Sequence, residues 1–150
     1  MYNYVIIYTR FFSQKREGFL SEYFSQERDI RLILAALRAK KWNKSIQQEL
    51  QFEDFAEPLV AYILVQKDAK EFEPPEEYKE LKTLFTLHEK KPQELEKKLI
   101  EYRIKKIEDL LEGELFSIEA VLGYAVKLFL IESWWQLDFD QGKQTLNQLV

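Results

Sequence analysis

Glycine and proline are scarce in this chain, with four of each among 150 residues. Both residues interrupt helices, whereas the strong helix formers Leu, Glu, Lys, Gln and Ala are abundant. The sequence therefore predicts long helices joined by few turns, and an all-α fold. Since 46% of the residues are apolar, a chain of this length can bury one sizeable core, which argues against a disordered protein.

Hydrophobic periodicity predicts a helical bundle of seven or eight helices. Their expected limits are 2–15, 19–42, 45–50, 59–66, 76–88, 93–111, 117–137 and a last helix from 138 or 140 to 149. Segment 59–66 also fits a short buried strand. The Pro74-Pro75 pair makes the clearest break, but it is too short for a domain linker. We therefore expect one all-helical domain over 1–150, either complete or as the C-terminal part of a longer protein.

Segment 117–137 is the most apolar of these predicted helices. Ser117 is its expected N-cap, and Glu119 lies in the first turn, where the helix dipole favours a negative charge. Apolar positions cover more than half of the circumference, so we expect other helices to surround this central helix. Gly123 would then allow a neighbouring helix to approach closely.

Five charged side chains fall on helix faces that are otherwise apolar. They are Glu27 and Arg31, which can pair at i,i+4, together with Arg38, Arg103 and Glu132. One interpretation is a buried acid–base site with perturbed protonation. The other is a structural ion-pair network, or long side chains that reach solvent from the edge of the core. We favour the structural interpretation, because no nucleophile, metal-ligand set or phosphate-binding loop accompanies these residues.

Composition argues against several classes of function. Lys and Arg number 22 against 26 Asp and Glu, and the net charge of −4 disfavours general binding to nucleic acid or anionic lipid. The chain has no cysteine and a single histidine, His88, and its glycines are isolated. We therefore expect a protein that is not an enzyme and has no cofactor, metal or nucleic-acid partner. No apolar stretch reaches the ~20 residues of a membrane span, and no signal peptide is recognisable, so we expect a cytoplasmic location.

The three tryptophans are candidates for a protein interface. Trp134 and Trp135 place their rings on different sides of one helix, so that one can pack in the core while the other contacts a neighbour or partner. Trp42 follows the basic pair Lys40-Lys41. Because the chain is acidic overall, we interpret this run as a solvated helix end rather than a phosphate contact.

Two segments resemble the C-type subunit (d-type in eukaryotes) of V/A-type rotary ATPases. Residues 27–41, ERDIRLILAALRAKK, resemble the Glu-x-Asp…Ile…Leu-Arg-Ala-Lys helix of that protein, and residues 117–124, SIEAVLGY, resemble its Ile-Glu-Pro-Val-Ile-Ala-Tyr helix start. The chain departs from the pattern at Ala120, where the C-type family usually has Pro, and at Asn43, where Gly usually follows the basic helix end. Members of the C-type family are also about twice as long as this chain.

Nearly the whole chain, including Phe52-Glu53-Asp54 and Phe72-Glu73-Pro74-Pro75, looks still more like the bacterial uncharacterised family DUF2764. Genes of this family are typically found among V-type ATPase genes. The resemblance implies a non-catalytic assembly or central-stalk subunit that binds rotor or stalk subunits of the ATPase at the membrane periphery. The alternative is a free-standing helical enzyme or small-molecule-binding domain that uses the Glu/Arg cluster.

Overall fold

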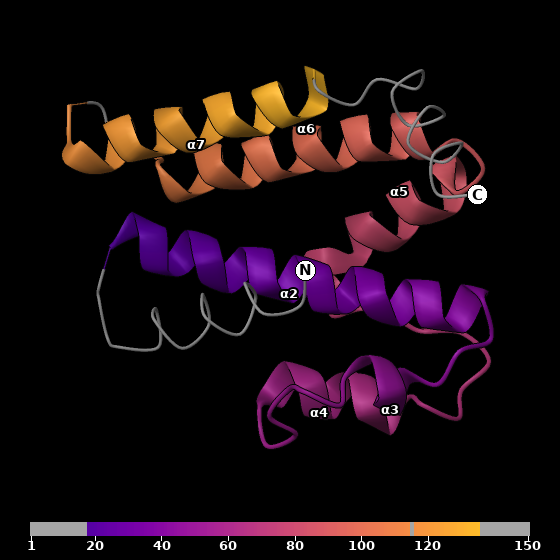
Figure 1. Cartoon of the computed structure of the whole chain (residues 1–150). Helices are drawn as coiled ribbons and strands as arrows, with labels where there is room; N and C mark the ends of the chain where they lie inside the picture. The colour runs from indigo at the N-terminus through magenta and orange to yellow at the C-terminus, as the bar shows by residue number, and fades with distance from the viewer. Residues whose placement is uncertain (1–17, 115, 136–150) are drawn as a thin grey trace, which may run out of the picture. The chain divides into compact units, whose positions relative to one another are not determined.

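The computed structural model describes residues 18–114 and 116–135, and every regular element within these ranges is helical (Figure 1). The elements are α2 (Phe19–Lys41), α3 (Ile46–Glu49), α4 (Pro58–Val65), the 3-10 helix η1 (Glu76–Tyr78), α5 (Lys79–His88), α6 (Pro92–Leu110) and α7 (Ile118–Trp135). The all-α prediction is confirmed, and the segment expected at 59–66 is a helix that ends at Val65. The helices expected at 2–15 and up to 149 lie outside the described residues, so the total of seven or eight stays a prediction.

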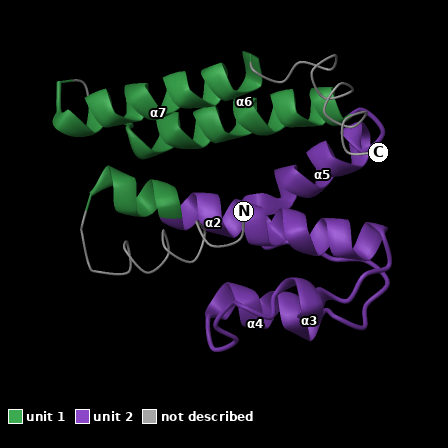
Figure 2. Ribbon diagram, in the orientation of Figure 1, with its two compact units in different colours: residues 1–24, 92–150 green, residues 25–91 purple. Residues whose placement is uncertain are grey.

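The chain divides into two compact units (Figure 2). Unit 1 comprises residues 1–24 and 92–150, and unit 2 comprises residues 25–91. Helix α2 contributes its first turns to unit 1 and the remainder to unit 2. The second boundary falls between Lys91 and Pro92, where Pro92 begins α6 at a position that needs no N–H donor. A single domain over 1–150 stays a prediction.

The larger part of α2 supplies much of the core of unit 2. Ile30, Ile33 and Leu37 recur at helical spacing and are at most 6% exposed. Helices α3 and α4 add Ile46 and Ile63. The remaining fully or nearly buried apolar side chains of this unit are Leu32, Leu34, Ala36, Ala39, Leu50, Val60, Phe72, Tyr78, Leu81 and Phe85.

The C-terminus of α2 ends in a turn that the sequence signals. Asn43 adopts a left-handed conformation with φ +51°, which asparagine tolerates better than most residues. The Lys44 N–H donates to the carbonyl of Ala39 at 2.8 Å, and the Asn43 N–H donates to that of Lys40 at 3.3 Å. This pair of hydrogen bonds satisfies carbonyls of the last helical turn. It leaves Trp42 outside the helix and 60% exposed.

Unit 1 contains the antiparallel pair α6 and α7, which lie side by side (Figure 1). Gly113, with φ +89°, lies in the turn between them. The Ser117 hydroxyl accepts a hydrogen bond from the Ala120 N–H at 3.2 Å, so Ser117 caps α7 as predicted. Glu119 in the first turn of α7 accepts a hydrogen bond from the Phe19 N–H at 3.1 Å.

We expected other helices to surround α7, but the described residues do not cover it on all sides. Within this helix, which the structure describes from end to end, Gly123 is the one buried residue, and the described neighbour that packs along it is α6. Each helix of such a pair covers one side of the other, and the apolar residues on the far side of α7 stay exposed. Among the described helices, each is too short or too polar to cross a lipid bilayer.

Candidate interaction surface

The helical wheel placed several charged residues on buried faces, and this prediction is wrong for three of them. Arg31 and Arg38 of unit 2 and Glu132 of unit 1 are exposed. Glu27 is half-buried. Arg103 is also half-buried, with its guanidinium 3.8 Å from Glu96. A structural ion-pair role for these residues stays a prediction, but the five residues do not form one buried group, because three of them are exposed.

The error in α2 arises because its buried face is narrower than its apolar residues suggest. Leu20 and Phe24 share a narrow sector with Arg31 and Arg38 at 100° per residue, and these two apolar side chains are only half-buried. The buried residues of α2, which include Phe19 in the first turn as well as Ile30 and Leu37, lie outside this sector. A wheel that counts Leu20 and Phe24 as part of the core face therefore also encloses the two exposed arginines.

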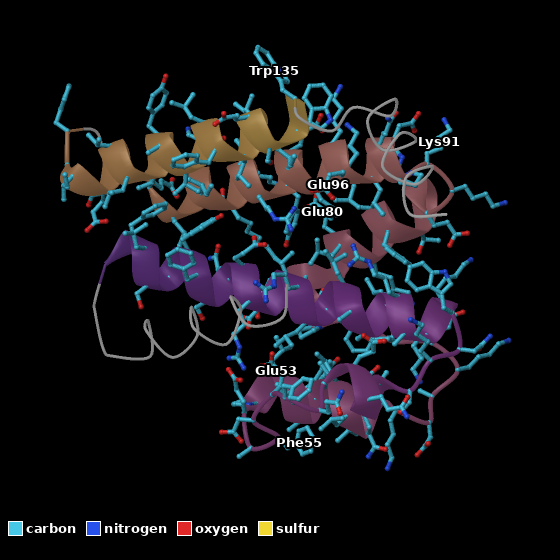
Figure 3. The ribbon with its side chains drawn as sticks, viewed as in Figure 1. Glu53, Phe55, Glu80, Lys91, Glu96 and Trp135 are labelled. Atoms are coloured by element: carbon cyan, nitrogen blue, oxygen red, sulfur yellow. The ribbon has the colours of Figure 1, made fainter. Side chains whose placement is uncertain are left out.

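The arginine at the centre of a charged cluster in unit 2 is Arg28. Its guanidinium donates to both carboxylate oxygens of Glu57, and its Nη2 donates to Glu53 Oε2 at 2.9 Å. Glu57 is the N-cap residue of α4, and Glu53 lies in the segment that joins α3 to α4 (Figure 3). The Glu57 hydrogen bonds are the largest cause that raises the pKa of Arg28 above its ordinary value. The cluster fixes α2 to the start of α4.

Asp29 forms a second polar contact beside this cluster. Its carboxylate accepts a hydrogen bond from Tyr78 Oη at 3.0 Å, which connects α2 to η1. Burial raises the pKa of Asp29, and the Tyr78 hydrogen bond opposes that shift. Sequence reasoning missed both contacts, because residues 25 to 49 positions apart give no periodic signal. In the part of the chain that the structure describes, no group of three His, Cys, Asp or Glu residues is arranged to hold a metal ion.

Seven large apolar side chains of α7 are exposed, and they lie along one side of the helix. Their positions fall within a sector of about 160° at 100° per residue, with Glu132 inside the same sector. We call these seven residues the α7 stripe: Ile118, Val121, Tyr124, Leu128, Phe129, Ile131 and Trp135. Such a surface suits the burial of a complementary apolar face.

The two tryptophans at the end of α7 differ in exposure, but neither lies in the core. Trp134 is half-buried, whereas Trp135 is 78% exposed and points away from the helix pair (Figure 3). Lys97 Nζ lies 5.7 Å from the centre of the Trp134 ring, a cation–π contact. Both tryptophans line an open hollow of about 450 Å³ with Gln93, Glu94 and Lys97.

Trp42, the third interface candidate, is an exposed ring in unit 2. Lys44 Nζ lies 6.0 Å from its ring centre. This contact involves a lysine beside the ring and leaves most of the ring surface accessible, as its 60% exposure shows. An interface role for the three tryptophans stays a prediction.

Comparisons with known proteins identify the family. Residues 3–150 match the family described as "Protein of unknown function (DUF2764)". Similar proteins, each called uncharacterized, occur in Chlamydia trachomatis serovar D, with 32% identity over 130 residues, and Chlamydia muridarum, with 30% over 129. These alignments cover 86% of this chain and 48% of each relative, so the chain spans about half the length of the curated relatives it matches. No solved structure matches significantly. The chain belongs to the DUF2764 family.

Proposed function

We propose that this protein is a non-catalytic assembly subunit of a bacterial V/A-type ATPase, bound in the cytoplasm to the rotor or stalk subunits of that complex. The α7 stripe is the observation that carries the proposal. A monomeric protein rarely exposes an apolar patch larger than about 300–600 Å², and larger patches are usually interaction sites. The stripe offers rigid aromatic side chains, which often anchor protein interfaces.

The choice of an ATPase as the partner complex rests on resemblance. The segment 27–41 that resembles the C-type family lies in α2, and the segment 117–124 begins α7. Both segments are helical, as they are expected to be in that family. The association of DUF2764 genes with V-type ATPase genes also supports an ATPase as the partner complex. The match to DUF2764 spans nearly the whole chain.

The enzymatic or ligand-binding alternative has less support. It requires a buried Glu/Arg cluster, but Arg31, Arg38 and Glu132 are exposed. The terminal guanidinium nitrogens of Arg28 are occupied by two carboxylates. A metabolite screen by thermal unfolding tests the alternative, because a ligand at 100 times its dissociation constant adds about 2.7 kcal/mol of stability.

Affinity capture tests the proposal. The tagged protein is isolated from its bacterial host under conditions in which the membrane-bound ATPase keeps its activity, and the recovered proteins are identified by mass spectrometry. We expect rotor or stalk subunits at levels well above those recovered with the tag alone. Recovery of no ATPase subunit from extracts that retain an intact ATPase would contradict the proposal.

A further inference from the structure

We propose that one end of unit 2 binds the surface of a membrane rich in anionic phospholipid. Three segments meet at this end: residues 38–49, from the last turn of α2 through α3, residues 67–71 after α4, and residues 88–91 at the end of α5. We call the surface that they form the basic end. The inference goes beyond the proposed function, because it concerns unit 2 alone and requires no ATPase subunit.

Direct contacts hold the three segments of the basic end together. Lys41 Nζ lies 2.7 Å from Glu89 Oε2, an ion pair that joins the end of α2 to the end of α5. Lys40 Nζ donates hydrogen bonds to the carbonyls of Lys67 and Ala69, which joins the same turn of α2 to the segment after α4. The sequence shows only the short run around Trp42, because the other two segments lie 27 or more positions away.

Cations outnumber anions at the basic end even when its own ion pairs are counted. The three segments contain eight Lys or Arg and four Asp or Glu, a net charge of +4 with His88 neutral. This count includes the pairs Lys41–Glu89 and Lys44–Glu49. Three helices end at this surface, and the partial negative charge at each C-terminus is about half an elementary charge. An excess of more than two positive charges therefore remains.

The other residues of unit 2 have the opposite charge. They contain four Lys or Arg and nine Asp or Glu, a net charge of −5. The overall acidity of the chain therefore hides a separation of charge within this unit. A flat anionic surface that touches only the basic end gains the attraction of its cations, while the acidic remainder stays in solvent.

Trp42 gives the basic end an aromatic ring that can enter a lipid headgroup layer. Residues 41–45 are all exposed, and the Trp42 ring is 60% exposed in the turn that Asn43 closes. Lys44 Nζ lies 6.0 Å from the ring centre, and Lys41 precedes the ring in sequence. Tryptophan is enriched at membrane–water interfaces, where neighbouring lysines reach the phosphates with their ammonium groups. The combination of ring and cations suits an anionic bilayer.

Other polyanions fit the basic end less well. A nucleic acid that follows the protein surface beyond the basic end would meet the acidic remainder of unit 2, which repels phosphates. An acidic peptide binds best in a groove or along a sheet edge that holds its backbone, whereas the basic end presents a turn with five consecutive exposed residues. Both classes of ligand serve as competitors in the test.

Vesicle co-sedimentation with the full chain tests the inference. Vesicles of phosphatidylcholine with about half phosphatidylglycerol are compared with phosphatidylcholine alone at about 0.1 M salt, where charges more than about 10 Å apart are largely screened. We expect at least about tenfold tighter binding to the anionic vesicles and loss of this preference at about 1 M salt. Brominated lipids should quench tryptophan fluorescence in the wild type. The lipid-dependent quenching should disappear in Trp42→Phe, although Trp134 and Trp135 remain.

Charge variants locate the binding surface. Arg38→Glu/Lys90→Glu reverses two exposed cations of the basic end and should weaken binding to the anionic vesicles at least about tenfold. Arg31→Glu/Lys79→Glu is the matched control, because it changes the net charge of unit 2 equally at exposed positions about 15 Å from Lys41 and Glu89 along α2 and α5. It should weaken binding less than about threefold. If circular dichroism shows that the first double variant is unfolded, Lys44→Gln/Lys90→Gln replaces it and should weaken binding severalfold.

Five results would overturn the inference. These are equal binding to anionic and neutral vesicles, equal losses in the two double variants, lipid-dependent quenching that persists in Trp42→Phe, tighter binding to a polyglutamate peptide or a single-stranded oligonucleotide than to the anionic vesicles, and release from the vesicles by inorganic phosphate at constant ionic strength. The last result would indicate a discrete phosphate site rather than a lipid surface. The vesicles contain no ATPase, so each outcome is independent of the proposed assembly function.

Discussion

Gly123 of α7 lies directly against the side chain of Leu111, and a Cβ at this position fits only if that side chain moves. An ideal Cβ on Gly123 would overlap Leu111 Cδ1 and would lie 3.5 Å from Ile107 Cγ2 of α6. Glycine in a helix costs about 1 kcal/mol relative to alanine, and here it allows the two helices to approach closely. The sequence predicts this close approach, although it does not predict which side of α7 faces the neighbour.

The first prediction concerns this contact. Gly123→Leu should destabilise the protein by about 1–3 kcal/mol, because the larger side chain overpacks the contact. Gly123→Ala should have a smaller effect, because the terminal methyl of Leu111 can rotate away and alanine favours the helix. Urea unfolding measures both changes. A Gly123→Leu variant as stable as the wild type would show that α6 and α7 do not pack closely at this position.

The second prediction concerns the Arg28 cluster. Arg28→Ala should cost about 1–3 kcal/mol, between the values for surface and buried ion pairs, because the side chains of Arg28 and Glu53 are each 24% exposed. The loss also leaves Glu53 and Glu57 close together without the cation between them. Arg38→Ala, in the same helix but exposed, is the matched control and should cost less than about 1 kcal/mol. If urea unfolding showed that the two variants lose equal free energies of unfolding, the assignment of Arg28 to a stabilising cluster would be contradicted.

The third prediction concerns pH. Because burial raises the pKa of Asp29 in the folded state above its ordinary value of 3.8, the folded protein holds this proton more tightly than the unfolded chain does. The contribution of Asp29 to stability therefore falls as the pH rises from about 3.8 through the higher folded pKa. Asp29→Asn removes this titration and keeps an acceptor for Tyr78. The free energy of unfolding of the wild type minus that of Asp29→Asn should decrease between about pH 3.5 and 7. If this difference increased over the same range, folding would lower the pKa of Asp29, which would contradict the prediction.

The fourth prediction concerns the exposure of α7. Phe129→Ser should change the free energy of unfolding by no more than about 0.5 kcal/mol, because Phe129 is 69% exposed. Leu99→Ala, at a position of α6 that is 1% exposed, should cost about 2–5 kcal/mol. A loss of several kcal/mol in Phe129→Ser would mean that α7 is covered on both sides, as the sequence alone suggested.

Local features of the fold were largely predictable from the sequence. Hydrophobic periodicity located the helices within the described residues to within a few positions. Asn43, Pro92 and Ser117 marked helix ends for reasons that depend only on their own chemistry: a tolerated left-handed conformation, a missing N–H donor and a capping hydroxyl. These signals are local, so no knowledge of the tertiary arrangement is required.

The candidate surface was less predictable for two physical reasons. Periodicity reports that a face is apolar, but the same pattern serves an internal core and an external partner, so α7 was assigned to the centre of the bundle. In the Arg28 cluster, Glu53 and Glu57 follow Arg28 by 25 and 29 positions in the sequence. Nothing in the sequence near Arg28 distinguishes it from Arg31. Only the tertiary arrangement of unit 2 selects Arg28.

Quantitative capture of ATPase subunits by stripe variants tests the central claim most directly. Wild-type protein, Phe129→Glu and a matched Leu87→Glu variant, changed at a side chain of unit 2 that is 71% exposed, are tagged, expressed at equal levels in the bacterial host, and used to isolate partners from extracts with an active ATPase. The account predicts that the wild type and Leu87→Glu recover equal amounts of rotor or stalk subunits, and that Phe129→Glu recovers about tenfold less. Absence of ATPase subunits from all three preparations, or equal recovery with Phe129→Glu, would contradict the claim that the α7 stripe joins this protein to the ATPase.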